Sequence, residues 1–473
     1  MRKRKIMQGL LAAAVVMAAA GNEADAAIQG TAEKTLEQAV DARPSADVRQ
    51  KAQQLARSRV TVSKVEMAQG SALRQSELLR LVPELAKQTV DVQRLSRQLA
   101  LYNENGALAI AVRFERADGD SYRAIVAARQ SKPDTSGVFF SNNGSVYNGD
   151  WRATATYVNR NLSGRGDTVG VALTGSPDHW RQLRQGAFSY RFLLPKAGDA
   201  MTFTASHSDS RLSDLAHGYP FDLASAGKST RFGLSWQHYL ANSQREQDWF
   251  DIGVTHHRGR ADTVLSLTGY HGIIGHYDVS HTDGVVAFCH RERGQRHIFH
   301  WRAAYQGNFD GDQTDFHAMT PGSAKHYHIW QGNMDYFYRF KSGNSWMLGL
   351  RAAGQYTNGA LIGCEKFGAG GRDSVRGFDE NIRTADRGIS GSVELYTPQL
   401  APGLRLLAFV DAASLSDKQL PAADLVSGGL GVRYDRGQVH LALDYAGIMH
   451  EPDSVSSDPA GHRRWNVWGG VSF

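Results

Sequence analysis

The chain ends in Trp465-Asn-Val-Trp-Gly-Gly-Val-Ser-Phe473, and this stretch decides the predicted fold. Successive side chains of a β-strand point to opposite faces, so odd and even positions separate. One face holds Trp465, Val467, Gly469, Val471 and Phe473. The other face holds Asn466, Gly470 and Ser472. A soluble β-sandwich or propeller would need an apolar interior, whereas this alternation predicts a strand with lipid on one side and water on the other.

Segments of about ten residues with the same alternation fill the chain after Pro133, separated by tight turns and longer polar loops. We predict them at 151–160, 168–174, 186–194, 201–207, 229–239, 249–257, 263–270, 328–340, 345–356, 389–397, 404–411, 426–434 and 439–448. A first strand near Val138 and uncertain ones near Val285 and Phe299 raise the count to about sixteen or seventeen, and an even number is expected. Residues 134–473 are therefore predicted to form a transmembrane antiparallel β-barrel of about 16 strands. The closing Phe473 resembles the C-terminal signature of bacterial outer-membrane barrels.

A small α+β domain is predicted at residues 60–130, before the barrel. A strand at 60–67 is followed by amphipathic helices at 75–87 and 91–102 and by strands at 107–115 and 122–128, in the order β-α-α-β-β. Its predicted core residues are Val62, Leu78, Leu81, Leu95, Leu99, Tyr102, Ile110, Val112 and Ile125.

The N-terminus has the features of a secretory signal peptide. Four basic residues, Arg2-Lys-Arg-Lys5, precede an apolar run at 9–21, and Ala24-Asp-Ala26 supplies a cleavage site. The run of about thirteen residues would span only about 20 Å, too short for a transmembrane anchor. We predict that residues 1–26 are removed and that 27–59 form a helical plug or linker region, with a degenerate first domain as the alternative.

Composition and motifs argue against several classes of function. The net charge of +6 over 473 residues is small, and no dense basic tract occurs, so nucleic acid is not an expected partner. No nucleotide-binding loop, nucleophile elbow or metal-ligand spacing is present, so we expect no enzyme activity, no catalytic residues, no cofactor and no metal site. Two sets of polar residues are assigned to loops or strand ends: Asp310, Asp312 and Asp315, and His271, His276 and His281. Cys289 and Cys364 either form a bridge or are both free.

One segment is too polar for a core and too specific for a linker. It is Phe367-Gly-Ala-Gly-Gly-Arg-Asp-Ser-Val-Arg-Gly-Phe378, with four glycines among its last eleven residues. Glycine permits positive φ angles and close approach to another surface. Arg376 near its end therefore needs a partner. A charge-assisted pair with an acidic residue would hold the loop more firmly than a neutral contact.

Strand alternation identifies candidate partners for Arg376. In 404–411 it turns Arg405, Leu407, Phe409 and Asp411 inward, and in 389–397 it turns Ser390, Ser392, Glu394 and Tyr396 inward. Asp411 is therefore the first candidate partner and Glu394 the second. We predict that this pair positions the loop and sets the open or closed state of a pore; the alternative is that Arg376 only stabilises the barrel.

These features together resemble the two-partner secretion transporters, the haemolysin secretion/activation branch of the BamA-like outer-membrane superfamily. The resemblance rests on the signal peptide, a polypeptide-transport-associated (POTRA) type domain, the barrel and the Val375-Arg-Gly-Phe378 motif, with 161–167 resembling a family turn. It implies that a loop at 357–388 folds into the barrel and that Phe409-Val-Asp411 is an inner-wall motif. The implied loop motif comprises Gly370, Gly371, Ser374, Val375, Arg376, Gly377 and Phe378. Family members typically carry two POTRA domains, whereas this chain has room for one.

The resemblance implies a pore in the outer membrane of a Gram-negative bacterium, with the POTRA-like domain in the periplasm. Its partners would be a large secreted polypeptide of exoprotein, haemolysin or adhesin type, the outer-membrane lipid and, during biogenesis, the barrel assembly machinery. Export would proceed without nucleotide hydrolysis. An outer-membrane protein assembly or insertion factor is the alternative, and a passive porin would lack both the domain and the motif.

Overall fold

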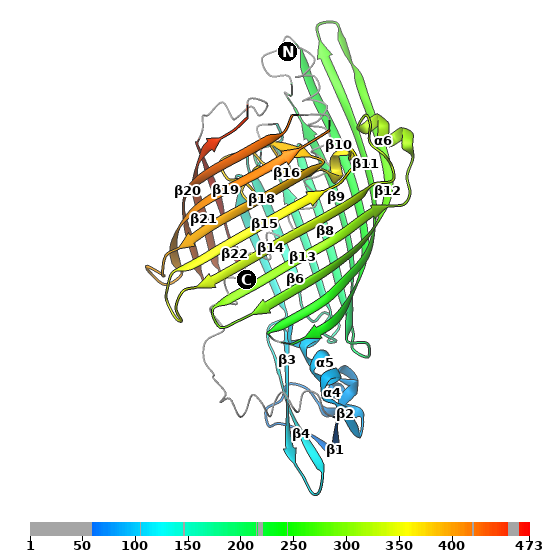
Figure 1. The fold of residues 1–473 in the computed structure, drawn as a ribbon, viewed down its shortest axis with the longest axis vertical. Coiled ribbons are helices and arrows are strands. Elements are labelled where there is room, and N and C mark those ends of the chain that lie inside the picture. Colours follow the sequence, from blue (N-terminus) through cyan, green and yellow to red (C-terminus); the bar gives the residue numbers. More distant parts are fainter. Residues whose placement is uncertain are drawn as a thin grey trace.

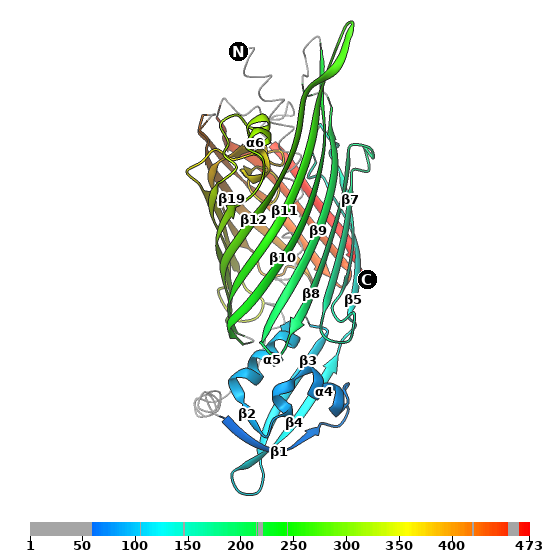
Figure 2. The same ribbon diagram turned by 90° about the vertical axis from the view of Figure 1, so that its right-hand side faces the viewer.

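The computed structural model describes residues 59–473 except 105, 145–146, 214, 216–220, 244, 419–420 and 453–462. The predicted signal peptide (1–26) and all of the predicted helical region (27–59) except its last residue lie outside the described residues. In the described part, a small α+β domain precedes a closed antiparallel barrel of sixteen strands (Figures 1 and 2). Among the described helices, none combines the length and the apolar character needed to cross a membrane.

The α+β domain has a four-stranded sheet in the order β2-β1-β4-β3, in which β1 and β4 are parallel. Its elements are β1 (Arg59–Met67), α4 (Gln75–Leu81), the 3₁₀ helix η2 (Pro83–Ala86), β2 (Thr89–Asp91), α5 (Val92–Glu104), β3 (Leu108–Arg116) and β4 (Ser121–Gln130). The predicted helix at 75–87 is wrong as one element, because Pro83 lacks an amide hydrogen and begins a separate 3₁₀ turn. The predicted order also omitted β2, whose three residues are too few for a visible alternation.

The core of this domain lies between α4, α5 and one face of the sheet. Most predicted core residues are buried there, and Leu99 and Val112 pack against it while partly exposed. The prediction for Ile125 is wrong: Ala124, Val126 and Ala128 face the core. Ile125 therefore points to the opposite face of β4, because neighbouring residues in a strand alternate.

The barrel consists of consecutive antiparallel strands and closes by pairing β22 with β5. The strands are β5 (Asp134–Ser141), β6 (Arg152–Asn159), β7 (Thr168–Gly175), β8 (Leu183–Leu194), β9 (Asp199–Leu212), β10 (Asp222–Asn242), β11 (Glu246–Leu267), β12 (Tyr270–Arg293), β13 (His297–Asn308), β14 (His328–Arg339), β15 (Met347–Tyr356), β18 (Arg387–Tyr396), β19 (Leu404–Ser416), β20 (Ala423–Arg436), β21 (Val439–His450) and β22 (Arg463–Ser472). Phe473 extends the closing ladder, since its amide donates to the Ser136 carbonyl at 2.8 Å. The predicted 16-stranded barrel is confirmed.

The region from 246 to 293 differs from the prediction. The predicted strand at 263–270 does not exist separately: its first part continues β11, which pairs with β12 over their whole lengths. Consequently His271, His276 and His281 lie within β12 rather than at a strand end and its loop. The β11–β12 hairpin projects beyond the neighbouring strands (Figures 1 and 2). Asp310 and Asp312 precede a short helix, α6 (Gln313–Met319), which includes Asp315.

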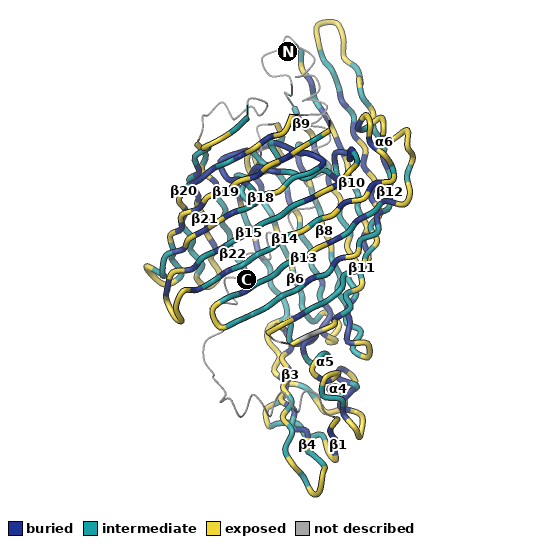
Figure 3. The backbone as a smooth tube through the Cα atoms, in the orientation of Figure 1, coloured by how far each residue is buried: buried dark blue, intermediate teal, exposed yellow. Residues whose placement is uncertain are grey.

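The two faces of the barrel differ in polarity. Leu406, Val410 and Leu430 are 41%, 50% and 67% exposed on the outside, whereas Asp411 and Asp444 are buried on the inside. Figure 3 shows buried and exposed residues alternating along these strands. An apolar outer band around a polar interior is the pattern of a membrane-spanning barrel.

A long segment between β15 and β18 lies against the inner face of the barrel. We call residues 357–386 the inward loop; it ends two residues before the predicted limit of 388, because β18 begins at Arg387. It contains the 3₁₀ helix η3 (Gly363–Glu365) and a small ladder of β16 (Phe367–Ala369) with β17 (Arg383–Ala385). Residues 370–382 form the tip between these two short strands.

Candidate functional site

The tip of the inward loop folds through conformations that require glycine. Gly370 and Gly371 have φ angles of 108° and 89°. A Cβ atom on Gly370 would lie 2.4 Å from the carbonyl oxygen of Asp379, which is a severe clash. Gly377 has a φ of 96° and lies against β21, where an added Cβ would be 3.4 Å from the Cβ of Ala446. The glycines therefore let the tip turn tightly and approach the wall closely.

Apolar side chains on both sides of Arg376 hold the tip against the wall. Val375 and Phe378 are 0% and 2% exposed, in a cluster with residues of β19 and β20 such as Leu415 and Leu425. Ser374 precedes them and its amide bonds to the Gly371 carbonyl at 3.3 Å. Burying two such side chains contributes about 1.5–3 kcal/mol each, so the tip is anchored by packing as well as by charge.

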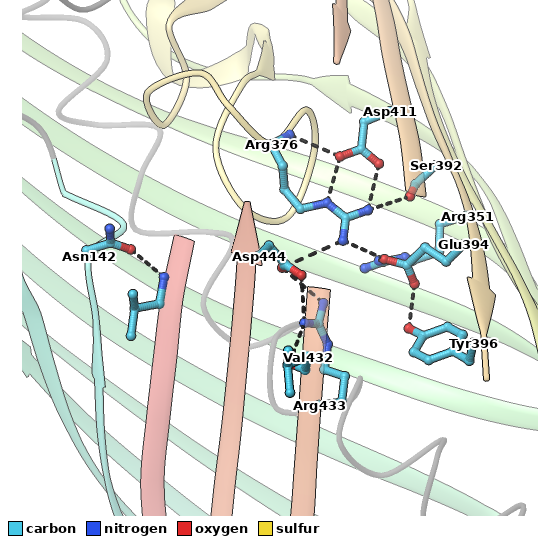
Figure 4. Close-up of polar contacts among 11 residues, drawn as sticks. Asn142, Arg351, Arg376, Ser392, Glu394, Tyr396, Asp411, Val432, Arg433 and Asp444 are labelled. Atoms are coloured by element: carbon cyan, nitrogen blue, oxygen red, sulfur yellow. Dashed lines mark hydrogen bonds and ion pairs between the residues drawn. The ribbon is translucent and has the colours of Figure 1, made fainter. Parts of the chain in front are cut away.

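Arg376 makes a bidentate pair with Asp411 on β19 (Figure 4). Its Nε donates to Oδ2 at 2.7 Å and its Nη2 to Oδ1 at 2.8 Å, and its backbone amide donates to Oδ2 at 3.1 Å. Nη2 also donates to Ser392 Oγ at 3.2 Å. The guanidinium lies 3.5 Å from the ring centroid of Phe409. Three of the residues predicted to face inward, Ser392, Phe409 and Asp411, therefore contact Arg376.

Two further carboxylates approach the same guanidinium. Nη1 of Arg376 lies 2.8 Å from Glu394 Oε1 on β18 and 3.7 Å from Asp444 Oδ2 on β21. Asp411 and Glu394 therefore contact Arg376 together, although the sequence presented them as first and second choices. All four side chains are 2% exposed or less. Three carboxylates therefore hold the buried guanidinium of Arg376. Removing one partner of a buried ion pair typically costs about 3–5 kcal/mol of stability.

Two arginines of the wall balance the remaining charge. Arg351 on β15 donates to Glu394 at 2.6 Å, and Arg433 on β20 donates to the two oxygens of Asp444 at 2.7 and 3.0 Å. Tyr396 also donates to Glu394 at 2.6 Å. We call the six charged residues the Arg376 cluster: Arg351, Arg376, Glu394, Asp411, Arg433 and Asp444.

Three members of this cluster were not predicted from the sequence: Arg351, Arg433 and Asp444. All three lie on strands that were predicted from the sequence, at alternate positions that face the barrel interior. Asp444, for example, alternates with the outward Leu441 and Leu443. The alternation rule that identified Asp411 would have found them if it had been applied to every strand rather than to the two that follow the motif.

The model of the haemolysin secretion/activation protein ShlB/FhaC/HecB family matches residues 119–434, well over half of the chain. The chain belongs to this family. It is a two-partner secretion pore with an outer-membrane β-barrel, as the resemblance in the sequence indicated. No curated protein sequence matches it significantly.

Solved structures share the fold of this family member. CdiB from Escherichia coli has a TM-score of 0.72 at 17% identity, covering 88% of this chain and 76% of that one. CdiB from Acinetobacter baumannii has a TM-score of 0.68 at 16% identity, covering 88% and 74%. BamA from Haemophilus ducreyi lacking POTRA domains 1–3 is less similar, with a TM-score of 0.52 at 14% identity over 88% and 85%. The family match over residues 119–434, rather than these similarities of fold, leaves the alternative of an assembly factor not favoured.

The α+β domain, which is consistent with a POTRA-type domain, contacts one end of the barrel through α5 (Figure 2). Glu104 at the end of α5 pairs with Arg191 on β8 at 3.2 Å and with Arg291 on β12 at 2.5 Å. Tyr239 on β10 donates to the same carboxylate at 3.2 Å. Burial acts to raise the pKa of Glu104, but these three partners outweigh burial and hold that pKa below its usual range.

The turn between β6 and β7 also faces α5. It is the segment 161–167, in which Asp167 accepts hydrogen bonds from the Ser163 amide and hydroxyl at 2.9 and 2.8 Å. A Cβ on Gly166 would lie 2.8 Å from the ring of Tyr102 on α5. The family-like turn therefore packs against the α+β domain, so it contributes to the junction between domain and barrel.

The two cysteines settle a point that the sequence left open, and two groups of possible metal ligands differ from what it predicted. Cys289 and Cys364 are both free, so the alternative of a bridge is not present. His257, His281, Asp283 and Glu365 lie together with the spacing of metal ligands, as do Glu246, Asp248 and His290. No metal site was predicted from the sequence, because these residues match no metal-ligand motif.

Proposed function

We propose that the Arg376 cluster is a latch that holds the inward loop inside the barrel and opens during export of a large partner polypeptide. The observation that carries this proposal is the burial of one loop guanidinium against carboxylates from three wall strands. Such a contact holds a loop in one position until an opposing free energy of similar size releases it. The exported chain itself would supply that free energy by binding and folding outside.

Charge balance favours a releasable contact over a purely structural one. If Arg376 leaves, Glu394 keeps Arg351 and Asp444 keeps Arg433. Only Asp411 loses its guanidinium partner, so the wall stays nearly charge-matched without the loop. The β-ladder of the barrel is also continuous from β15 to β18 and does not use the loop tip. These features support a barrel that tolerates removal of the loop.

We place the α+β domain in the periplasm, where it would receive the unfolded partner. Its sheet has two edges, β2 and β3, and β3 is the longer, with nine residues. An extended segment of the partner would add to such an edge through backbone hydrogen bonds. The partner is a large secreted polypeptide of exoprotein, haemolysin or adhesin type, and the apolar outer band contacts outer-membrane lipid. The strand ending at Phe473 would be recognised by the barrel assembly machinery.

The test is secretion of the partner by variants of this chain. Arg376→Glu places a carboxylate against Asp411, Glu394 and Asp444, so the loop cannot dock again in its defined position after release. Because export requires both the docked and the released state, the amount of partner in the medium and at the cell surface should fall strongly, while the barrel remains in the membrane. The matched control is Arg372→Glu on the same loop tip, where the guanidinium lies over the ring of Trp468 at 4.9 Å and forms no ion pair with a carboxylate of the described residues. Unchanged secretion by Arg376→Glu would contradict the latch.

Deletion of the whole gene separates the exporter from an assembly factor. An exporter would lose one large polypeptide from the medium or surface and keep the outer-membrane protein profile. An assembly factor would instead lower the amounts of several unrelated barrels, because its clients are other outer-membrane proteins.

A further inference from the structure

Four ionisable side chains converge where the inward loop meets the β11–β12 wall. We call them the His281 cluster: His257 on β11, His281 and Asp283 on β12, and Glu365 on η3. His257 and His281 are register partners on adjacent strands, and their rings stack with centroids 4.7 Å apart. All four residues are 9% exposed or less. The cluster lies on different strands from those of the Arg376 cluster.

The distances within the His281 cluster are too long for strong hydrogen bonds. His281 Nε2 lies 3.5 Å from both Asp283 Oδ2 and Glu365 Oε1, and His257 Nε2 lies 3.6 Å from Asp283 Oδ2. Good N–H···O bonds are about 2.7–3.2 Å long. Four ligands about 2.0–2.1 Å from a tetrahedral zinc ion would be separated by about 3.3 Å, close to these three distances, and the four candidate ligand atoms all lie within 4.8 Å of one another.

Buried polar atoms in this cluster also lack hydrogen-bond partners. Both ring nitrogens of His281, which is 1% exposed, have none within the described part of the chain, nor does Glu365 Oε1. A buried polar atom without a partner costs about 1–3 kcal/mol. A metal ion bound through His281 Nε2 and Glu365 Oε1 would satisfy two of these three atoms together.

Neighbouring side chains orient the two carboxylates. Tyr327 donates to Asp283 Oδ1 at 2.7 Å, and Gln306 donates to Asp283 Oδ2 at 3.1 Å and to Glu365 Oε2 at 2.7 Å. The oxygens Asp283 Oδ2 and Glu365 Oε1 face the histidines. Hydrogen bonds of this kind are typical of the residues behind metal ligands, which fix ligand orientation. Phe316 of α6 packs edge-on to His281 at 5.6 Å and excludes water from that side.

We propose that the His281 cluster binds a divalent first-row transition ion, with Zn²⁺ as the best match. Two imidazole nitrogens and two carboxylate oxygens suit zinc, whereas Ca²⁺ and Mg²⁺ prefer oxygen ligands alone. Because Glu365 belongs to the inward loop and the other ligands to the wall, the ion ties the loop to β11 and β12. This second attachment is independent of the Arg376 latch, and its test does not depend on export.

Arg231 on β10 competes with the metal for this site. Its Nε donates a hydrogen bond to His257 Nδ1 at 3.1 Å. His257 Nδ1 must therefore be unprotonated, and the ring proton of neutral His257 lies on Nε2. Zinc binding at Nε2 moves the proton to Nδ1, so the Arg231 side chain must turn away. In the absence of a metal, Arg231 supplies positive charge beside the two carboxylates. Its removal should therefore raise metal affinity, whereas an ion-pair network without a metal would only lose a partner.

The experiment measures metal content and zinc affinity of the purified full-length barrel in detergent. We expect about one zinc ion per chain after growth with zinc, removable by a chelator and restored by zinc alone but not by Mg²⁺. His281→Gln and Glu365→Gln should weaken zinc binding by more than about 100-fold, and Tyr327→Phe by about 10- to 100-fold. Arg231→Gln should tighten it.

Two histidine controls exclude binding elsewhere. His271→Gln changes an exposed residue of the same strand that contacts Ser266, and His290→Gln disrupts the other acidic group with Glu246 and Asp248. Both should keep the ion, and all variants should retain the electrophoretic mobility of a folded barrel. The proposal is overturned if wild-type protein neither retains zinc nor gains thermal stability from it, or if the His281→Gln and Glu365→Gln variants bind zinc as wild type does.

Discussion

Replacing Arg376 by Gln is the most informative perturbation of the latch. The substitution keeps much of the side-chain length but removes the charge and the fork that contacts Asp411 at 2.7 and 2.8 Å. Asp411 would then keep the backbone amide of residue 376, and Glu394 and Asp444 would keep their wall arginines. The buried cluster, which has three positive and three negative residues, would carry one excess negative charge.

The expected magnitude follows from the burial of the pair. Removing one partner of a buried ion pair costs about 3–5 kcal/mol. The lower end applies here, because only Asp411 loses its guanidinium partner. At about 1.4 kcal/mol per tenfold, a loss of about 3 kcal/mol raises the equilibrium constant for release of the loop about 100-fold. Asp411→Asn should weaken loop docking by a similar free energy. The double variant should lose less docking free energy than the sum of the two single variants, because it removes both charges of the pair.

Thiol labelling in membranes measures this equilibrium. Val375→Cys is placed in a background with Cys289→Ala and Cys364→Ala, because Val375 is 0% exposed in the docked loop. A membrane-impermeant maleimide reacts only when the loop leaves the wall. We expect labelling to accelerate about 100-fold with Arg376→Gln and to fall back partly in the double variant with Asp411→Asn.

The latch hypothesis would be refuted by equal labelling rates for the wild-type sequence and Arg376→Gln. Strictly additive effects of the Arg376→Gln and Asp411→Asn substitutions would also contradict direct coupling between these residues. The Arg372→Gln variant controls for loss of positive charge at the tip and should leave the labelling rate unchanged, since Arg372 contacts Trp468 rather than a carboxylate.

Three further substitutions test the junction of domain and barrel, the loop tip and the closing strand. Glu104→Gln should detach α5 from the barrel, seen as faster hydrogen exchange in α5, because it leaves Arg191 and Arg291 without the carboxylate. The pKa of Glu104 is lowered in the folded protein, so its contact with the two arginines should be fully present above the ordinary glutamate pKa of about 4.3. The contact should be lost only as the pH falls through the lowered pKa. Loss of docking between pH 7 and 5 would contradict the role of Glu104 in this contact. Gly377→Ala should weaken loop docking by about 1–3 kcal/mol, because φ is 96° there, and labelling at wild-type rate would refute this. Phe473→Ala should reduce the amount of folded barrel in cells but should not reduce refolding in detergent, because Phe473 pairs with Ser136 through its backbone alone. Equal losses in both assays would argue against recognition of Phe473 by an assembly machinery.

The barrel and the first partner of Arg376 were predictable because both depend on a period of two. Lipid on one side and polar groups on the other impose the alternation on each strand, so inward positions such as Asp411 and Glu394 follow from parity. The same rule failed for Ile125, where the choice of face in the α+β domain was wrong. It also failed at 263–270, where the polar residues of the long β11–β12 hairpin resemble a turn between two strands.

The His281 cluster was not predictable from sequence. Its members come from β11, β12 and η3, and Glu365 lies 84 positions beyond His281 in the chain. Their meeting depends on the register of His257 with His281 and on the path of the inward loop. Neither is encoded in local periodicity, so only the folded chain brings these ligands together.

The most direct test of the Arg376 cluster as a latch is labelling of Val375→Cys while the partner polypeptide is being exported. We predict protection of this thiol in cells that lack the partner and rapid labelling during export, because the loop must leave the wall carboxylates for the partner to pass. Continued protection of the thiol during active secretion would show that the loop stays docked, and would contradict the role of the Arg376 cluster as a latch.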